Sequence, residues 1–137
     1  MISINIFDDT SRLLNKALDL RSSRQQVIAS NIANSETPGY SRAEFKFEEA
    51  LSNALSGEGT FLQATHPQHI SFNSPNVNEV RGTLMRHPDT RGIGDENSVS
   101  VDAEMIAMTE NQLMYETAAK LLQKKLALLK YAVRDGQ

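Results

Sequence analysis

The chain contains no cysteine and no tryptophan, and only five phenylalanines and three tyrosines among its 137 residues. Without cysteine, disulfides, thiolate catalysis and cysteine-ligated zinc sites are excluded. The formal net charge of −3 does not indicate the strongly basic surface that is typical of general nucleic-acid binders. No apolar stretch approaches the ~20 residues that a membrane-spanning helix needs. The length favours one domain with a modest core.

The first residues also lack the features of a secretory signal. Residues 1–9 have neither a basic start nor an apolar core, so a cleaved signal peptide is not expected. Taken alone, these signs suggest a soluble cytoplasmic protein.

Two long stretches near the ends of the chain follow the helical period. Apolar residues recur at spacings of three, four and seven over residues 9–33 and again over residues 101–133. Ser100 or Asp102 is placed to cap the second helix. At 1.5 Å per residue the helices are roughly 37 and 50 Å long. We assign these residues to their apolar stripes: Leu13, Leu14, Ala17, Leu18, Leu20, Val27, Ile28, Leu113, Met114, Ala118, Leu121, Leu122, Leu128 and Leu129.

A proline-containing turn is expected to follow the first helix, because Pro38 cannot lie within it. The sequence from Thr37 to Tyr40 fits a type II turn in which Gly39 supplies the positive φ. Asn34 is predicted to leave the helix in the left-handed conformation.

The middle of the chain is less regular. Apolar residues alternate with polar ones over residues 42–47, which predicts a short strand or extended arm with one apolar face, and residues 47–55 return to helical spacing. Residues 57–98 hold five of the seven glycines and three of the four prolines, which predicts an irregular, β-containing insert or a flexible arm. Candidate edge strands within it are residues 61–62 and 69–72.

We therefore predict a mainly α fold in which the two long terminal helices form a coiled-coil-like layer around a small irregular, β-containing middle region. One domain is expected, with segments at residues 1–56, 57–98 and 99–137. The terminal stripes alone bury too little apolar area to offset the conformational entropy of ordering both helices. We therefore expect neighbouring chains to supply further burial and the helices to become ordered on assembly. An ordinary helical hairpin within one chain remains the alternative.

Two segments carry a resemblance to a known family. Residues 29–34, Ala-Ser-Asn-Ile-Ala-Asn, followed by Thr-Pro-Gly-Tyr at 37–40, resemble the amino-terminal signature of the flagellar rod and hook axial proteins. Residues 97–105 and 111–115 resemble the matching carboxyl-terminal signature. The first signature comprises Asn31, Ile32, Ala33, Asn34, Thr37, Pro38, Gly39 and Tyr40. The second comprises Val101, Asp102, Glu104, Met105, Asn111 and Tyr115. The short length and the segments at 65–70 and 121–130 favour a proximal rod member.

The resemblance implies a structural subunit of the bacterial flagellar basal body, not an enzyme. Such a subunit would polymerise through its terminal helices into the hollow axial shaft, beside further copies and other rod proteins. A proximal position would place it next to the FliE adaptor, the MS ring and the type III export gate. The resemblance further implies export without a cleaved signal peptide, which replaces the cytoplasmic interpretation. No cofactor, metal, nucleic acid or membrane insertion is expected.

Two other functions are compatible with parts of the sequence. His66, His69 and His87 raise the idea of a small metal hydrolase, but no H-E-x-x-H helix is present and the segment is broken by prolines. A self-contained helical adaptor that binds one partner is the other alternative. The lysines at 120, 124, 125 and 130 fit a solvated helix face, or one that meets acidic neighbours, better than a nucleic-acid patch.

Overall fold

The computed structural model describes residues 9–56, 76–90 and 94–134. The elements run in the order α1 (Asp9–Ala33), β1 (Arg42–Lys46), α2 (Glu48–Ser56), the short 3-10 helix η1 (Val77–Glu79), β2 (Thr83–His87) and α3 (Val101–Arg134). This confirms the predicted class: long helices lie near both ends of the chain, and a small two-stranded antiparallel sheet lies between them.

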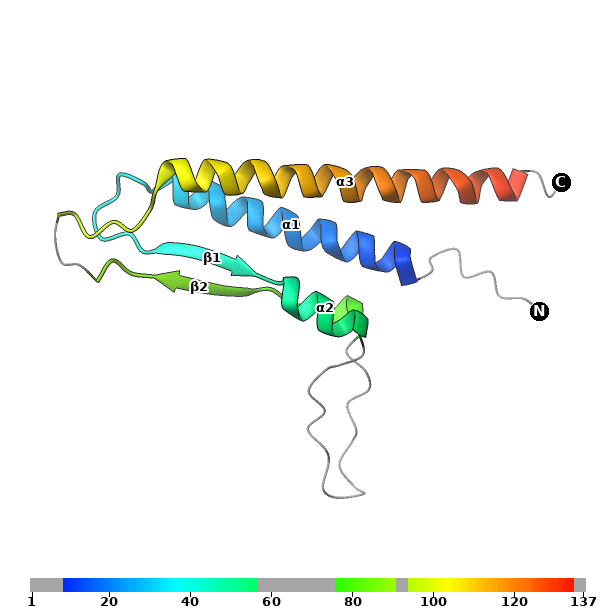
Figure 1. Ribbon diagram of the computed structural model, residues 1–137, viewed down its shortest axis with the longest axis horizontal. Helices are drawn as coiled ribbons and strands as arrows, with labels where there is room; N and C mark the ends of the chain where they lie inside the picture. Colours follow the sequence, from blue (N-terminus) through cyan, green and yellow to red (C-terminus); the bar gives the residue numbers. More distant parts are fainter. Residues whose placement is uncertain (1–8, 57–75, 91–93, 135–137) are drawn as a thin grey trace, which may run out of the picture.

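Strands β1 and β2, which pair although α2 and η1 lie between them in the chain, are called the hairpin below. The helices and the hairpin form three layers (Figure 1). Helix α1 lies in the middle, antiparallel to α3 on one side and packed against β1 on the other. Helix α3 has 34 residues and α1 has 25, so α3 continues past the start of α1. Within the described part of the chain, neither long helix is apolar enough over its length to span a membrane.

The contact line between α1 and α3 is partly polar. On α3 the buried residues are Glu104, Asn111 and Ala118, which repeat at seven, as expected for one side of a coiled-coil-like pair. On α1, Leu20 and Ile28 are buried together with Ser11 and Asn31. The apolar stripe of α3 therefore coincides only in part with the face that α1 covers.

The hydrophobic core lies between α1 and the hairpin. It consists of Leu20, Phe47 and Val80, and partly buried Phe45, Leu51 and Ala54 pack against it. The alternating arm predicted after the turn is β1, and the structure shows that its apolar residues pack against α1. Helix α2 follows at the predicted position. Strand β2 pairs with β1 from Arg42 opposite His87 to Lys46 opposite Thr83. The candidate edge strands at 61–62 and 69–72 lie outside the described residues.

The turn after α1 has the predicted form. Gly39 has a φ of 71°, and Tyr40 donates its backbone N–H to the Thr37 carbonyl at 3.2 Å. The prediction for Asn34 was wrong, since Glu96 is the only non-glycine residue with positive φ in the described part of the chain. Asn34 instead closes the helix through its side chain, which donates to the Ser30 carbonyl at 2.8 Å.

The start of α3 is defined by Ser100 and not by Asp102. The backbone N–H of Ala103 approaches the Ser100 hydroxyl at 3.5 Å, and that of Glu104 donates to the Ser100 carbonyl at 3.0 Å. Asp102 lies in the first turn, where its negative charge interacts favourably with the positive end of the helix dipole.

Candidate functional site

The first signature is centred on Asn31, a fully buried side chain that joins three elements. Its Nδ2 donates to the Ala43 carbonyl at 2.7 Å and to Glu104 Oε2 at 2.9 Å. Its Oδ1 accepts the Ala43 backbone N–H at 2.9 Å and the Tyr40 hydroxyl at 3.2 Å. An amide offers two donors and two acceptor sites, and all four are used here. Asn31 therefore fixes β1 and the start of α3 to the last turns of α1.

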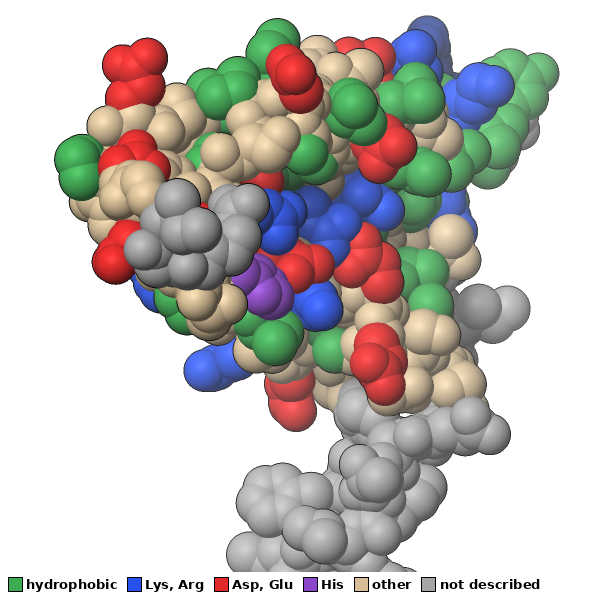
Figure 2. Space-filling model, turned by 60° about the vertical axis from the view of Figure 1, so that its left-hand side comes forward, with side chains coloured by type: hydrophobic (Ala, Val, Ile, Leu, Met, Phe, Trp, Pro, Cys, Tyr) green, Lys and Arg blue, Asp and Glu red, His purple; other side chains and the backbone are tan. Residues whose placement is uncertain are grey.

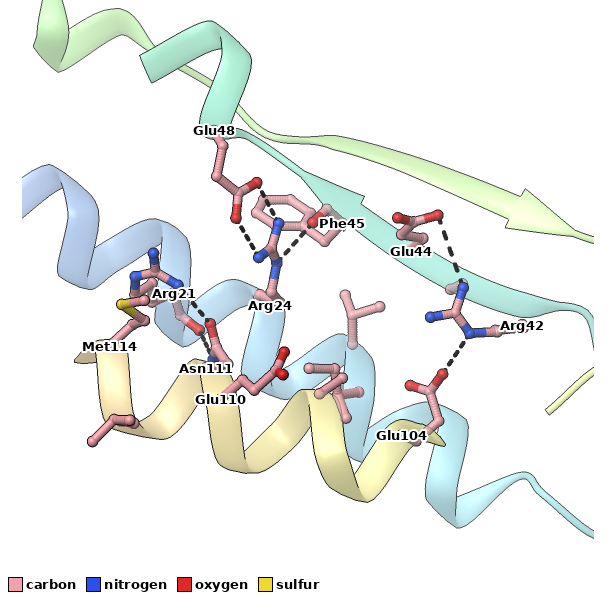
Figure 3. Close-up of a pocket in the computed structure, with 15 residues that line it drawn as sticks. Arg21, Arg24, Arg42, Glu44, Phe45, Glu48, Glu104, Glu110, Asn111 and Met114 are labelled. Atoms are coloured by element: carbon pink, nitrogen blue, oxygen red, sulfur yellow. Dashed lines mark hydrogen bonds and ion pairs between the residues drawn. The ribbon is translucent and has the colours of Figure 1, made fainter. Parts of the chain in front are cut away.

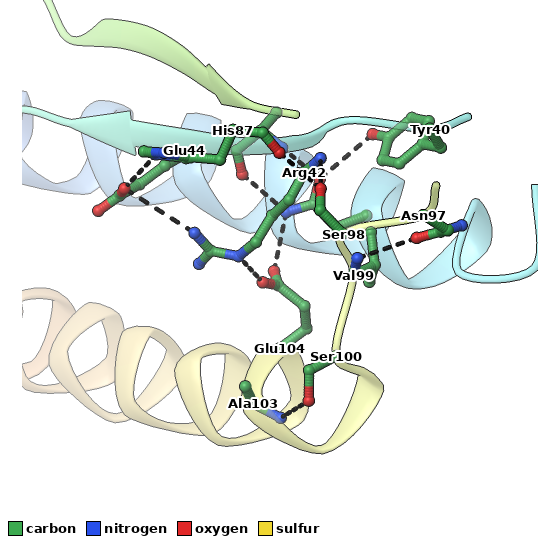
Figure 4. A network of polar contacts seen from close by, with 12 residues as sticks. Tyr40, Arg42, Glu44, His87, Asn97, Ser98, Val99, Ser100, Ala103 and Glu104 are labelled. Atoms are coloured by element: carbon green, nitrogen blue, oxygen red, sulfur yellow. Dashed lines mark hydrogen bonds and ion pairs between the residues drawn. The ribbon is translucent and has the colours of Figure 1, made fainter. Parts of the chain in front are cut away.

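Glu104 extends this contact to the hairpin (Figure 4). Its carboxylate is fully buried and accepts Arg42 Nε as well as the Asn31 amide. Arg42 also lies 3.8 Å from Glu44, whose carboxylate is 2.8 Å from His87 Nε2. A buried carboxylate is tolerated when it is paired and hydrogen-bonded, and both conditions hold for Glu104.

The residues before α3 bind the turn from the other side. Ser98 Oγ accepts the Arg42 backbone N–H at 2.8 Å and donates to the His87 carbonyl at 2.6 Å, so it joins the ends of both strands. The Asn97 amide lies 2.8–2.9 Å from the carbonyls of Asn34, Ser35 and Thr37, so it holds the turn that follows α1. We call residues 31–44 and 95–104 together the hinge, since they connect α1, the hairpin and α3.

A hollow of about 670 Å³ lies between β1 and α3, with α1 as its floor (Figure 3). Figure 2 shows basic and acidic side chains gathered in this hollow. Arg24 donates Nε to the Phe45 carbonyl at 3.0 Å, and both of its terminal nitrogens bind the Glu48 carboxylate. The Arg24 guanidinium also lies over the Phe47 ring, 4.5 Å from its centre, with Arg21 at 5.5 Å. These contacts attach the hairpin and α2 to the middle of α1.

The charges in the hollow influence each other. Burial alone would raise the pKa of Glu48, but the hydrogen bonds from Arg24 and from backbone N–H groups outweigh burial and lower the pKa below its ordinary value. The pKa of Arg21 is lowered, chiefly by burial and further by Arg24, against the opposing effect of Glu48. Glu48 remains about half exposed, so its ion pair with Arg24 is screened by solvent.

Asn111 provides a second polar contact between α1 and α3. Its amide donates to the Arg21 carbonyl at 2.9 Å and to Gln25 Oε1 at 2.8 Å. A buried asparagine in a helix pair disfavours other registers, because sliding the helices would leave the amide without partners. Asn31 and Asn111 thus hold the antiparallel pair at two levels.

Other sequence-predicted residues lie at the surface. Along α3, a line of exposed apolar side chains repeats at spacings of seven, eight and seven, and its member Leu113 also lies at the edge of the hollow. We call this line the outer stripe; it consists of Ile106, Leu113, Leu121 and Leu128, which are 62%, 64%, 50% and 70% exposed. Its neighbours Met105, Met114 and Tyr115 are also exposed.

The predicted assembly residues therefore occupy three environments. Leu20, Ile28 and Ala118 are buried between the elements of one chain. Seven others are half-buried along the α1–α3 pair: Leu13, Leu14, Ala17, Leu18, Val27, Leu122 and Leu129. The remaining four are exposed on α3: Leu113, Met114, Leu121 and Leu128.

The signature residues divide in a similar way. Asn31, Glu104 and Asn111 are buried polar residues, and Ile32, Asn34 and Tyr40 are half-buried. The exposed members are Ala33, Thr37, Pro38, Gly39, Val101, Asp102, Met105 and Tyr115. Sequence reasoning missed Arg24, Arg42 and Asn97 as structural contacts, although Asn97 lay within the matching segment.

The metal interpretation finds no support in the described residues. His87 faces Glu44, and within residues 9–56, 76–90 and 94–134 no three side chains that bind metals gather at one point. His66 and His69 lie outside the described residues.

Comparison with known proteins adds an independent line of support. The family described as "Flagella basal body rod protein" matches residues 14–40, which span most of α1 and the turn. The flagellar basal body rod protein FlgB of Aeromonas hydrophila is 34% identical over 133 residues, covering 96% of this chain and 97% of the relative. FlgB of Salmonella typhimurium is 31% identical over 137 residues, covering 94% and 96%. A Cereibacter sphaeroides FlgB is 36% identical over 120 residues, covering 87% and 89%. With such identity over nearly the full length of several relatives, the chain belongs to the FlgB family of flagellar basal body rod proteins.

Proposed function

We propose that this protein is a proximal rod subunit that polymerises through its two terminal helices. As a FlgB family member it is a structural subunit of the flagellar basal body rod and assembles with other rod components. The proximal position, beside the MS ring, the FliE adaptor and the type III export gate, is the finer part of the proposal. It rests on the resemblance of both signatures and of the chain length.

The outer stripe is the observation that carries the assembly mechanism. Four large apolar side chains lie on one line of α3 and are each at least half exposed. Burying one such side chain fully is worth about 1.5–3 kcal/mol, so covering the exposed part of all four contributes up to roughly 4–8 kcal/mol per subunit. Exposed apolar patches of this kind are typical of protein interaction surfaces. We infer that neighbouring subunits cover the stripe in the rod.

The hinge has a complementary role in this mechanism. A regular polymer requires every subunit to hold its hairpin at the same angle to its helices. Asn31, Glu104 and Asn97 define that angle through buried or half-buried hydrogen bonds that only one arrangement satisfies. The exposed turn residues Thr37 and Pro38 remain available to neighbours.

Paired substitutions test the assembly face. Leu113→Gln with Leu121→Gln places two polar groups on the outer stripe, while Leu55→Gln with Leu84→Gln changes two leucines of similar exposure on α2 and β2. The proposal predicts that basal bodies isolated from cells contain the second variant at wild-type level and the first at a small fraction of it. Equal incorporation of both variants contradicts the proposal, provided that both are equally abundant in the cells.

Truncation provides a second test. Removing residues 1–20 or residues 120–137 is expected to abolish incorporation into the rod without preventing synthesis, because each deletion removes a large part of one terminal helix. Normal rod assembly with either truncated chain contradicts the proposed role of that helix. For the proposed export without cleavage, the intact mass of the chain recovered from basal bodies is the measurement. Loss of an amino-terminal segment would contradict that part.

A further inference from the structure

The charges of α3 are separated along its length. The first half, residues 101–117, carries Asp102, Glu104, Glu110 and Glu116 and no lysine or arginine. The second half, residues 118–134, carries Lys120, Lys124, Lys125, Lys130 and Arg134 and no aspartate or glutamate. The helix is therefore acidic over one half and basic over the other.

The helix dipole accounts for only part of this separation. Its effect falls off within the first and last turn, whereas Glu110 and Lys124 lie more than two turns from the ends of α3. Both side chains are exposed, and neither takes part in an ion pair within the described part of the chain. Fourteen residues separate them, or about 21 Å, so they cannot contact each other in one helix. Glu110 lies at the hollow that Arg21 and Arg24 also line, yet forms no ion pair with them, so both charges can meet an opposite charge on another molecule.

The outer stripe repeats over the same distance. A shift of fifteen residues brings Ile106 to the level of Leu121 and Leu113 to the level of Leu128. The same shift brings Glu110 to the level of residue 125, next to Lys124. The stripe alone allows a shift of seven residues as well, but that shift brings Glu110 to the level of Thr117. Apolar spacing and charge spacing together therefore favour a displacement of about 22 Å along the helix.

Other arrangements of two α3 helices fit less well. A parallel pair without a shift places Glu110 beside Glu110 and Lys124 beside Lys124, and like charges at such positions repel. An antiparallel pair matches the charges, but its two-fold symmetry closes the contact and leaves no equivalent surface for growth. A parallel, shifted contact uses different surfaces on the two partners and repeats without closing.

We propose that the outer face of α3 packs in parallel against α3 of a second copy of this chain, shifted by about fifteen residues, so that the acidic half of one copy lies beside the basic half of the next. This rests on the proposed function, since it specifies how the assembly face is used. The charge pattern fixes the shift between subunits, and the stripe supplies the apolar contact.

Charge reversal is the first test. Glu110→Lys and Lys124→Glu each place like charges at the shifted contact, and each is expected to lower incorporation into basal bodies by roughly fivefold. The two reversals combined restore the opposite charges between copies and should return incorporation to near the wild-type level. Glu49→Lys on α2 has the same change of charge away from α3 and should have no effect. Failure of the combined variant to recover overturns the proposal.

Cysteine cross-linking provides the decisive test, because the natural chain has no cysteine. A chain with both Glu110→Cys and Lys124→Cys should form disulfides between position 110 of one copy and position 124 of the next, giving products larger than a dimer in oxidised basal bodies. Disulfides between identical positions, or products that stop at the dimer, would overturn the proposal. So would disulfides that form only with a different rod protein into which one cysteine has been introduced. If the wild-type chain, followed through an affinity tag, is absent from basal bodies, the proposed function itself is refuted.

Discussion

Replacing Asn31 by alanine is the most informative single change in this protein. The substitution removes four hydrogen bonds and leaves three buried groups without their partner: the backbone N–H and carbonyl of Ala43 and one oxygen of Glu104. An unsatisfied buried group costs about 1–3 kcal/mol, so three of them, after some relaxation, predict a loss of about 3–5 kcal/mol in the free energy of unfolding. Losses of this size are rare for single substitutions.

Asn34→Ala is the matched control, because Asn34 belongs to the same signature but is half exposed. Its side chain donates to the Ser30 carbonyl at 2.8 Å and accepts from Thr37 at 3.3 Å. We expect a loss of about 0.5–1.5 kcal/mol. Urea unfolding followed by circular dichroism measures both variants, at one fixed protein concentration that is high enough for the helices of the wild-type chain to be ordered. With a typical urea dependence, Asn31→Ala should lower the midpoint by roughly 2 M. The reasoning is refuted if the two alanine variants lose the same amount.

Asn31→Asp separates the loss of hydrogen bonds from the loss of packing. Aspartate keeps the shape and the acceptor oxygens, but it removes both N–H donors and places a second carboxylate beside Glu104. The variant should therefore be at least as unstable as Asn31→Ala near pH 8 and should recover part of the loss near pH 4, where one carboxylate takes up a proton. A loss that does not change with pH would show that the two carboxylates do not meet.

Four further predictions follow from other contacts. Gly39→Ala should lower the free energy of unfolding by about 1–2 kcal/mol in thermal denaturation, because the backbone has a φ of 71° while the space around it is open; an unchanged melting temperature would contradict the turn. Glu48→Gln should lower the free energy of unfolding above pH 4.5, because Arg24 lowers the folded-state pKa of Glu48. This loss should disappear as pH falls through that lowered pKa, and a difference between variant and wild type that grows in acid would contradict this sign. Gly82→Ala should cost about 1–3 kcal/mol in urea, since its Cβ would lie 2.0 Å from the Phe45 ring, and a neutral effect would mean that the ring moves freely. The helical signal of the free chain should rise with protein concentration, and full cooperative helicity in dilute solution would contradict the dependence of the helices on assembly.

Features that depend on local sequence were predictable. Helical periodicity located α1 and α3, and Pro38 with Gly39 located the turn, because these signals act within a few residues. The apolar alternation after the turn located β1. The partner strand β2 was not predicted, since Thr83–His87 has exposed residues on both faces and is ordered by its pairing with β1.

Features that depend on distant residues were not predictable. The prediction for Asn34 failed because asparagine can end a helix in two ways, by a left-handed backbone or by a side-chain hydrogen bond to the last turn. Asn34 uses the side-chain hydrogen bond, and its carbonyl accepts the Asn97 amide from another part of the chain. The partly polar seam between the helices was also missed. Periodicity identifies an apolar stripe but not the face that a neighbouring helix covers, and on α3 the buried line runs through Glu104 and Asn111.

The central claim is that subunits of the rod cover the outer stripe of α3. The most direct measurement is a density map of the isolated basal body in which the side chains of this chain are resolved. The account predicts that Ile106, Leu113, Leu121 and Leu128 lie in contact with helices of adjoining subunits. A map in which these four side chains face solvent, with subunits joined only through the hairpin or the turn, would contradict it.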